Sequence, residues 1–324
     1  MSVKRVAIQV AFLPTFTLNK GFKMIVNQKV LNNIFLNVKA VFNQRTEKTK
    51  PLYPQISTKV PSTTKTNVYP FLGSFPSLRE WVGERVIKSL AAHNFSISNR
   101  KFESTISISR EDIEDDNIGM VSSMVSDMAD AAAHHPDELL FELIKQGFNQ
   151  KCYDGQPFFS ATHVVNIGGD ETTVSNVQVP ATGADEKPLW LLLDTTRPIN
   201  PFIWQERIPY EIQQITEGKE SLSFMTDEYF YGVRGRGNMG YGFWQMAFAS
   251  KKDLTTENFN DLYDRMCSQK NDAGRPLRIK PTILLVGMKN REAAFNIAKA
   301  QTLDNMKPNP NYGLVEVIVT PFLD

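Results

Sequence analysis

The chain has 324 residues, with 36 basic and 35 acidic side chains and a formal net charge of +1. This near-neutral balance disfavours a domain that clamps nucleic acid, because such domains usually carry a clear basic excess. The apolar fraction of 41 % supports a real core, in one large domain or two ordinary ones. Cys152 and Cys267 are too few for a disulfide framework or a cysteine-rich zinc site, so we expect two reduced thiols.

Residues 1–23 differ in character from the rest of the chain. Lys4 and Arg5 precede a short apolar run, as in a signal peptide, but the run contains Gln9 and no small-residue cleavage site follows it. Met24 opens a cleaner pattern. We therefore expect residues 1–23 to be an extension that is either disordered or upstream of the natural start.

Residues 24–66 are predicted to form an N-terminal helix and an arm. One apolar stripe at helical spacing runs along residues 30–42. It consists of Val30, Leu31, Ile34, Phe35, Val38, Val41 and Phe42. Residues 44–66 are polar and contain three prolines, which predicts an extended arm with little core of its own. Such a segment either folds back on its own domain or lies on a neighbouring subunit.

Residues 67–110 are predicted to form a long two-stranded excursion. The segment is rich in aromatic residues and is punctuated by glycine, proline and asparagine. Its last part, residues 102–110, alternates apolar and polar side chains, as a half-buried strand does. Isolated hairpins are only marginally stable in water, so we expect these two strands to pack against a partner.

Within residues 111–148, the segment 118–147 carries the strongest helical signal. Apolar side chains recur at spacings of three, four and seven, and the register carries across Pro136. They are Val121, Val125, Met128, Ala132, Leu139 and Leu143. This predicts one long helix kinked at the proline, or two helices nearly in line. Acidic residues 111–116 suit the start of a helix, and Gly147 is a plausible stop.

Residues 149–324 show mixed helix and strand patterns. Strands are predicted at 190–193 and 202–215, with Pro209 favouring an edge position. Segments 229–233 and 241–249 flank a glycine-rich stretch that we interpret as a turn. Thr255 can cap a helix, and residues 281–319 read as a β-α-β unit with a helix capped by Asn290.

The sequence offers weak candidates for chemistry. Residues 235–240 match GxGxxG, but a strand-like segment follows where dinucleotide binding needs a helix, so we place the match in a hairpin with glycines at positive φ. His134 and His135 are adjacent, which is poor spacing for joint metal ligands on a helix. His163 follows Cys152 and Asp154; a Cys-His nucleophile pair is possible there, but a structured loop is favoured. Acidic residues 111–116 are favoured as capping groups. We therefore predict no catalytic residue, cofactor or metal.

Eight sequence blocks carry a more specific signal than these patterns. They are residues 60–87, 101–105, 111–117, 135–140, 153–159, 193–198, 236–248 and 274–276. Together they resemble the Mu-like prophage major head subunit family, gpT, and the resemblance runs from about Met24 to the C-terminus.

This resemblance implies an α+β tailed-phage major capsid fold of the Hong Kong ninety-seven type. Residues 67–110 would then be the extended loop, residues 111–148 the spine helix of the peripheral domain, and residues 149–324 the axial domain, with strands near 200–250 returning to the peripheral domain. The implied function is a non-catalytic subunit that self-assembles, as pentamers and hexamers, into an icosahedral shell around double-stranded DNA. Its implied partners are itself, the scaffold/protease and portal proteins of the same head, and packaged DNA only non-specifically, without any membrane. Assembly would take place in the cytoplasm of a bacterial host.

Four residues of the predicted extended loop are candidates for inter-subunit contacts: Phe71, Phe75, Trp81 and Arg85. Aromatic residues also dominate protein cores, so an ordinary core position is the alternative for the three rings. Two other functions stay open at this stage. One is an encapsulin-like compartment of the same fold type, and the other is a two-domain α/β enzyme built on residues 281–319, which would need a convincing catalytic set.

Overall fold

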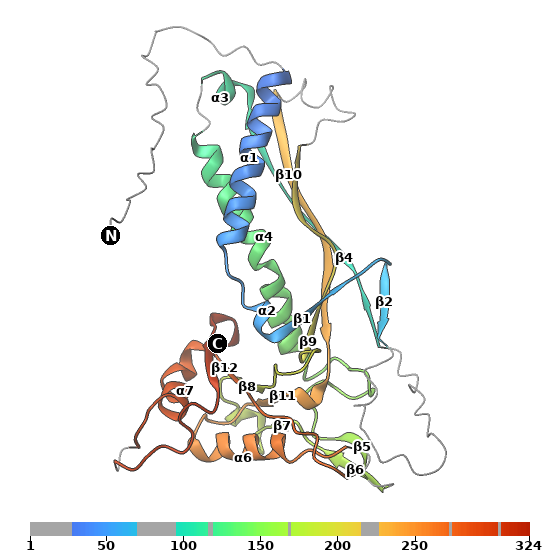
Figure 1. The fold of residues 1–324 in the computed structure, drawn as a ribbon, viewed down its shortest axis with the longest axis vertical. Coiled ribbons are helices and arrows are strands. Elements are labelled where there is room, and N and C mark those ends of the chain that lie inside the picture. The colour runs from blue at the N-terminus through green and yellow to red at the C-terminus, as the bar shows by residue number, and fades with distance from the viewer. Residues whose placement is uncertain are drawn as a thin grey trace, which may run out of the picture.

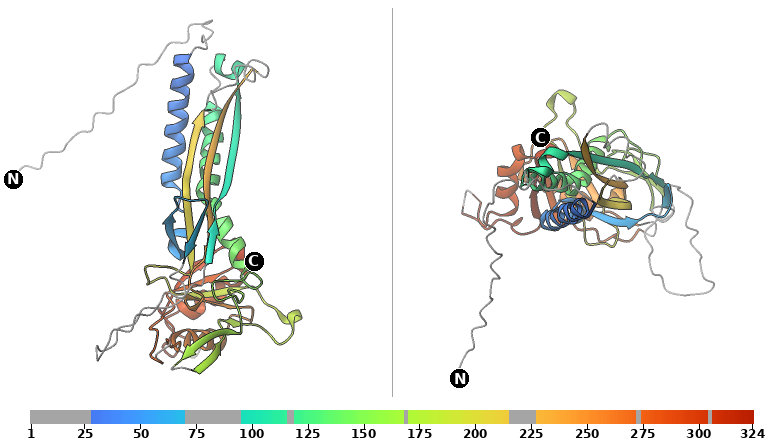
Figure 2. Two further views of the ribbon diagram at one scale, coloured as in Figure 1. Left: turned by 90° about the vertical axis from the view of Figure 1, so that its right-hand side faces the viewer. Right: turned by 90° about the horizontal axis from the view of Figure 1, so that it is seen from above.

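The structure, a computed structural model, describes residues 28–69, 95–115, 119–167, 170–214, 227–271, 274–303 and 306–324. An elongated body of two helices and long strands stands on a smaller mixed domain that contains the C-terminus (Figures 1 and 2). None of the described helices is long and apolar enough to span a membrane.

Two helices, α1 (Gln28–Lys48) and α4 (Gly119–Gln146), lie side by side along the body (Figure 1). The predicted stripe of α1 is buried at Leu31, Ile34, Val38 and Phe42, which pack with Val121, Val125 and Met128 of α4. The predicted helix is thus confirmed, but it continues past residue 42. The added turn is held by Arg45, whose guanidinium forms a bidentate ion pair with Asp130 of α4 at 2.5–2.8 Å.

Helix α4 is a single helix that includes Pro136. It ends at Gln146, and the predicted stop at Gly147 is confirmed. A Cβ at Gly147 would lie 2.7 Å from the Phe159 ring, so the glycine also allows close packing. The acidic segment forms a separate short helix, α3 (Arg110–Glu114), whose first turn is capped by the Ser109 hydroxyl.

Residues 44–66 contribute little to the core, as expected, and they fold back on their own subunit, which is one of the two alternatives that the sequence left open. After α1, a turn of helix, α2 (Tyr53–Ile56), leads into strand β1 (Ser57–Pro61). Ile56 is only 1 % exposed, and β1 pairs in parallel with residues 202–206. The turn is fixed by Asp137 of α4, whose carboxylate accepts hydrogen bonds from the backbone N–H groups of Leu52 (2.9 Å) and Tyr53 (2.6 Å).

The body is completed by a four-stranded sheet in the order β1-β9-β10-β4. Strand β10 (Glu228–Tyr241) pairs antiparallel with both β9 (Phe202–Gln214) and β4 (Arg100–Ser109). The pairing of β10 with β9 shifts register between Arg234 and Gly237, opposite Pro209. Proline has no N–H to donate, so it is tolerated at this bulge and beyond the end of β1. Beside the sheet, β2 (Thr66–Tyr69) and β3 (Phe95–Ser98) form a two-stranded antiparallel pair.

The glycine-rich stretch is not a hairpin turn, which corrects the sequence interpretation. Gly235, Gly237 and Gly240 lie inside the continuous strand β10, and none of them has a positive φ. These positions need glycine because neighbouring side chains pack directly against the backbone of β10, and not because the backbone adopts a positive φ. A Cβ at Gly237 would lie 2.6 Å from the Trp204 ring and 2.8 Å from the Gln205 carbonyl oxygen, and one at Gly235 would collide with the Tyr210 ring. No helix follows, so the match to a dinucleotide-binding motif has no structural support.

The smaller domain is built on a five-stranded mixed sheet in the order β13-β12-β8-β11-β7. Its strands are β7 (Val177–Gln178), β8 (Trp190–Leu193), β11 (Ala247–Ser250), β12 (Ile283–Val286) and β13 (Glu316–Val319). Both faces of the central strands are buried, so these strands are apolar without alternation. Leu191 and Leu193 face the end of α4, whereas Trp190 and Leu192 face α6 (Thr256–Cys267) and α7 (Arg291–Ala298).

The predicted β-α-β unit is confirmed as β12–α7–β13, with β12 and β13 parallel. Thr255 caps α6 as expected, accepting a hydrogen bond from the backbone N–H of Asn258. Asn290 stands at the N-cap position of α7 but does not cap it. Its side chain donates to the Pro188 carbonyl oxygen instead, at 3.0 Å.

The remaining short elements connect or flank these two parts. Strands β5 (His163–Ile167) and β6 (Asp170–Val174) form a separate antiparallel pair at the far end of the smaller domain (Figure 1). The 3₁₀ turns are η2 (Gly183–Asp185), η3 (Trp244–Met246), η4 (Met288–Asn290) and η5 (Pro321–Leu323).

Candidate functional site

The four residues predicted to contact neighbouring subunits, Phe71, Phe75, Trp81 and Arg85, lie outside the described residues. The two strands that flank this segment are described. Tyr69 of β2 pairs with Phe95 of β3, and the Tyr69 hydroxyl donates a 2.7 Å hydrogen bond to the buried Gln205 side chain of β9. The two residues that flank the segment 70–94, Tyr69 and Phe95, are therefore held in the fold of their own subunit.

Large apolar side chains are exposed on several separate parts of the molecule. On the helical body they are Leu36 (62 % exposed), Met120 (71 %) and Met124 (47 %). On the smaller domain they are Val164, Val179, Met288, Phe295, Leu303, Met306, Tyr312 and Phe322. These side chains are available for contacts with other proteins, although single exposed apolar side chains are also normal on a protein surface. The sequence patterns did not single these residues out, because a helical stripe identifies the buried face and leaves the opposite face unassigned.

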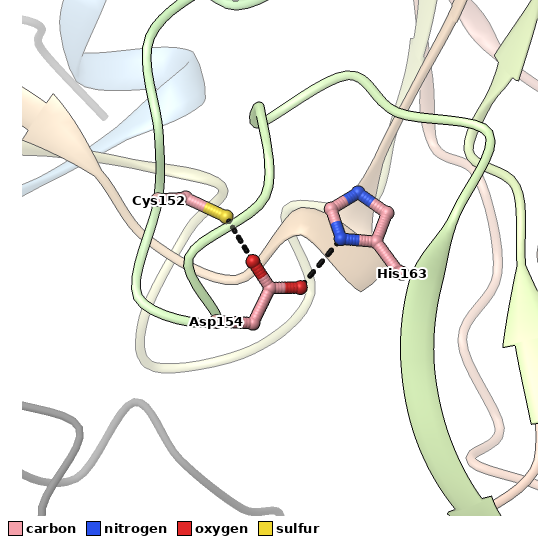
Figure 3. Close-up of side chains that lie close together, drawn as sticks. All are labelled: Cys152, Asp154 and His163. Carbon is pink, nitrogen blue, oxygen red and sulfur yellow. Dashed lines mark hydrogen bonds and ion pairs between the residues drawn. The ribbon is translucent and has the colours of Figure 1, made fainter. Parts of the chain in front are cut away.

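Cys152 and Asp154, in the loop that follows α4, form a largely buried cluster with His163, the first residue of β5 (Figure 3). The Asp154 carboxylate bridges the other two side chains. One oxygen accepts a hydrogen bond from the Cys152 thiol at 3.1 Å, and the other lies 2.5 Å from His163 Nδ1. Sequence inspection noted these three residues together but favoured a structured loop, and the loop is present. The Asp154-Gly155 turn signal is confirmed, with Gly155 at a φ of +81°.

The local packing fixes the cluster from both sides. The His163 ring is fully buried and stacks on the Trp244 ring, with 3.9 Å between centroids and 4° between planes. Asp154 also accepts a 2.9 Å hydrogen bond from the backbone N–H of Gln156. Trp244 gave no signal in the sequence, because a stacking partner 81 positions away follows no local pattern.

The electrostatics of the cluster argue against a nucleophile. Burial and the neighbouring Asp154 carboxylate raise the pKa of the Cys152 thiol far above its usual range. Burial also opposes ionisation of Asp154, but hydrogen bonds from His163, Cys152 and Gln156 prevail and lower the pKa of its carboxyl group. A nucleophilic cysteine needs the opposite environment, one that stabilises the thiolate. The surroundings of Cys152 therefore do not favour a cysteine nucleophile.

The adjacent histidines of α4 contact different partners, as expected from their spacing. His134 Nδ1 lies 3.3 Å from the Asp137 carboxylate, whereas His135 Nδ1 lies 2.6 Å from the Tyr210 hydroxyl of β9. The His135 ring also packs on Phe102 of β4, with 4.2 Å between centroids. These contacts join α4 to the sheet at the level of Pro136 and of the β10 bulge.

Comparison with known proteins gives a consistent result. The profile of the family described as Mu-like prophage major head subunit gpT matches residues 31–323. The chain is 38 % identical over 279 residues to the Mu-like prophage FluMu major head subunit of Haemophilus influenzae, covering 85 % of this chain and 91 % of the relative. It is 36 % identical over 305 residues to the major capsid protein of Escherichia phage Mu, covering 93 % of this chain and 100 % of the relative.

Solved structures agree with these sequence relatives. A chain of the bacteriophage JBD30 procapsid superposes with a TM-score of 0.82 at 43 % identity, over 92 % of this chain and 100 % of that chain. A chain of the JBD30 capsid superposes with a TM-score of 0.71 at 36 % identity, over 85 % of this chain and 92 % of that chain. The fold is thus that of a tailed-phage major capsid protein, which confirms the predicted α+β class.

The chain belongs to the Mu-like prophage major head subunit family, gpT. Its function is that of a major subunit of a phage head, so it associates with copies of itself in the virion shell. Members of this family are structural proteins and not enzymes, which confirms the non-catalytic function predicted from the sequence. The encapsulin-like alternative is not favoured.

Proposed function

We propose that the chain forms pentameric and hexameric rings that close into an icosahedral shell around double-stranded phage DNA. The observation that carries this proposal is that exposed apolar side chains occur on both parts of an elongated subunit, from Met120 in helix α4 to Phe295 in helix α7. Heterologous contacts between different surface patches generate rings when the rotation closes. Several modest contacts per subunit then act together, so weak interfaces add up to a stable shell.

The two parts of the fold support a division into functional regions. We assign residues 24–66 to the N-terminal helix and arm, 67–110 to an extended loop, and 111–148 to the spine helix of a peripheral domain. Residues 149–324 would form the axial domain, apart from strands near 200–250. In support of this exception, β9 and β10 run beside α4 in the body, whereas β8 and β11 belong to the smaller sheet.

The extended loop would bind a neighbouring subunit through Phe71, Phe75, Trp81 and Arg85. Tyr69 and Phe95, which flank this segment, pair with each other in their own subunit. Burying an aromatic ring in a partner's pocket contributes much of the binding energy of a typical interface.

The test is the Trp81→Ala variant. We expect it to assemble poorly while the unassembled subunit keeps the circular dichroism spectrum and urea midpoint of the wild type. Lys88→Ala, in the same segment but outside the proposed contacts, is the control and should assemble normally. Normal shells from Trp81→Ala, or an unfolded subunit, would each contradict the interface assignment.

Partners beyond the subunit itself follow from the same proposal. A scaffold/protease and a portal protein of the same head would direct assembly in the cytoplasm of the bacterial host. Packaged DNA would be contacted only non-specifically, consistent with a net charge of +1.

Co-expression with the neighbouring head genes followed by negative-stain electron microscopy tests this assembly route. Closed shells, or rings of five and six, are the expected result. A subunit that stays monomeric even in the presence of these genes would refute the proposal, and co-purification of a cargo enzyme inside the shell would favour the encapsulin-like alternative.

A further inference from the structure

The Cys152, Asp154 and His163 cluster has a donor set that a structural capsid role does not explain. Among the described residues, these three offer a thiol, a carboxylate and an imidazole whose candidate ligand atoms all lie within 4.8 Å of one another. Cys152 is 6 % exposed, His163 is fully buried, and the Asp154 side chain is 15 % exposed. The cluster is therefore enclosed, with access from the side of Asp154.

The spacing of these atoms is close to that of a metal site. In tetrahedral zinc coordination, bonds of about 2.0–2.3 Å place neighbouring ligand atoms roughly 3.3–3.8 Å apart. The thiol and carboxylate are already 3.1 Å apart, and the carboxylate and imidazole are 2.5 Å apart. Because the His163 ring is held against Trp244, admitting an ion would require Cys152 and Asp154 to move apart from His163 by about an ångström.

We propose that Cys152 Sγ, an Asp154 carboxylate oxygen and His163 Nδ1 form a binding site for one Zn²⁺-like divalent cation, with the fourth position open to water. Thiolate and imidazole ligands favour such borderline-soft cations over Mg²⁺ or Ca²⁺, which prefer oxygen ligands alone. The thiolate and the carboxylate together balance the charge of the cation, so the buried site is neutral when it is occupied.

The protons of the cluster can be accounted for. Without metal, the thiol donates to one oxygen of Asp154 and His163 Nδ1–H donates to the other, because a carboxylate can only accept. When metal binds, the thiol proton leaves to solvent and the imidazole proton moves from Nδ1 to Nε2. The Nδ1–H···Asp154 hydrogen bond would then be replaced by the bond from Nδ1 to the metal, and the proton would lie on Nε2, which is buried and has no hydrogen-bond partner in the described structure.

The consequence of occupancy would be local stiffening. Cys152 and Asp154 belong to the loop that follows α4, and His163 opens strand β5. A cation between them would tie the β5–β6 pair, which carries the exposed Val164 (55 %), to the end of α4. Metal would then order one of the surfaces that is available for contacts between subunits.

The proposal can be tested with Co²⁺ as a spectroscopic substitute for Zn²⁺. The unassembled full-length chain is stripped of metal with a chelator and titrated with Co²⁺. We expect an intense thiolate-to-cobalt charge-transfer band that saturates at one equivalent and disappears when Zn²⁺ is added. Absence of this band in the wild-type chain would overturn the proposal, whatever the variants do.

Three variants assign the ligands. Cys152→Ser should abolish the band, whereas Cys267→Ser, which removes the other free cysteine, should leave it unchanged. Asp154→Asn retains the thiol and should weaken Co²⁺ binding by at least about 10-fold. A band that survives in Cys152→Ser, or an unchanged affinity in Asp154→Asn, would show that the metal binds elsewhere. Circular dichroism of each metal-free variant establishes that the chain is folded.

Discussion

Gly242, directly after strand β10, provides the sharpest test of the claim that glycines in this region permit close approach. A Cβ at this position would collide with the carbonyl oxygen of Asn200 and lie 2.9 Å from that of Pro201. Ordinary contacts between carbon and oxygen begin near about 3.3 Å, so the backbone would have to move by several tenths of an ångström. The same movement would disturb the 2.7 Å hydrogen bond from the Gly242 N–H to the Pro201 oxygen.

The magnitude follows from these two effects. Overpacking a core typically costs about 1–3 kcal/mol, and a backbone hydrogen bond contributes about 0.5–1.5 kcal/mol, so Gly242→Ala should lower the free energy of unfolding by about 2–4 kcal/mol. With a urea m-value of about 3 kcal/mol per molar, the midpoint of unfolding shifts by roughly 1 M. The assay is urea unfolding of the unassembled subunit, followed by circular dichroism.

Gly119→Ala is the matched control. Gly119 also lacks a positive φ, but a Cβ there would meet nothing within 4 Å, and the residue opens helix α4. This variant should lose no stability and could gain up to about 1 kcal/mol from the higher helix propensity of alanine. The reasoning is refuted if Gly242→Ala unfolds at the wild-type urea concentration, or if Gly119→Ala loses as much stability.

Three further predictions follow from buried or paired polar groups. Asp137→Ala should lower the free energy of unfolding by about 1–3 kcal/mol in urea titrations, because α2 loses the carboxylate that accepts two of its backbone N–H groups. Tyr241→Phe should cost about 0.5–1.5 kcal/mol in the same assay, since the buried hydroxyl donates a 2.8 Å hydrogen bond to the Leu143 oxygen. Asp130→Asn should destabilise the subunit at neutral pH but not in acid. Hydrogen bonds from Arg45 and Thr49 lower the pKa of the Asp130 carboxyl below its ordinary value of 3.8, so the stabilisation is complete above that value and is lost as the pH falls through the folded-state pKa.

The controls for these three variants use exposed residues of the same kind. Asp127→Ala on the exposed face of α4 should be nearly neutral, as should Tyr312→Phe, whose ring is 51 % exposed. Equal effects at Asp127 and Asp137, or at Tyr312 and Tyr241, would contradict the assigned hydrogen bonds. For Asp130→Asn, a difference from the wild type that persists unchanged in acid would show that the ion pair with Arg45 is not its source.

Local patterns predicted the elements whose stability is mostly local. The helix around Val125 and Leu139, the cap at Thr255 and the strands of the β12–α7–β13 unit follow from periodicity and capping chemistry, which act within a few residues. The capsid fold itself was recognised from sequence blocks that resemble a family. Periodicity alone did not supply it.

The remaining features depend on partners that are distant in the sequence. Helix α1 continues to Lys48 because Arg45 meets a carboxylate 85 positions further along the chain. The glycines of β10 were assigned to a turn because glycine serves both positive φ and close approach, and only the position of the Tyr210 and Trp204 rings distinguishes the two. The cluster at Asp154 was visible as residue types, but its geometry depends on Trp244, which the sequence gave no reason to place there.

The irregular features of the body share one level of the molecule, and this has a mechanical consequence. Pro136 in α4, Pro209 in β9 and the bulge of β10 lie at the same level, linked by the contact between His135 and Tyr210. Each of the two prolines lacks a backbone donor, and the bulge interrupts the ladder between β9 and β10. Separate core clusters lie on either side of this level. One contains Tyr231 and Val233, and the other contains Met239 and Tyr241. We therefore expect the body to bend more readily at this cross-section than through either core. Such bending would let one subunit fit positions of different curvature in a shell by a small change in one angle, while both cores keep their packing.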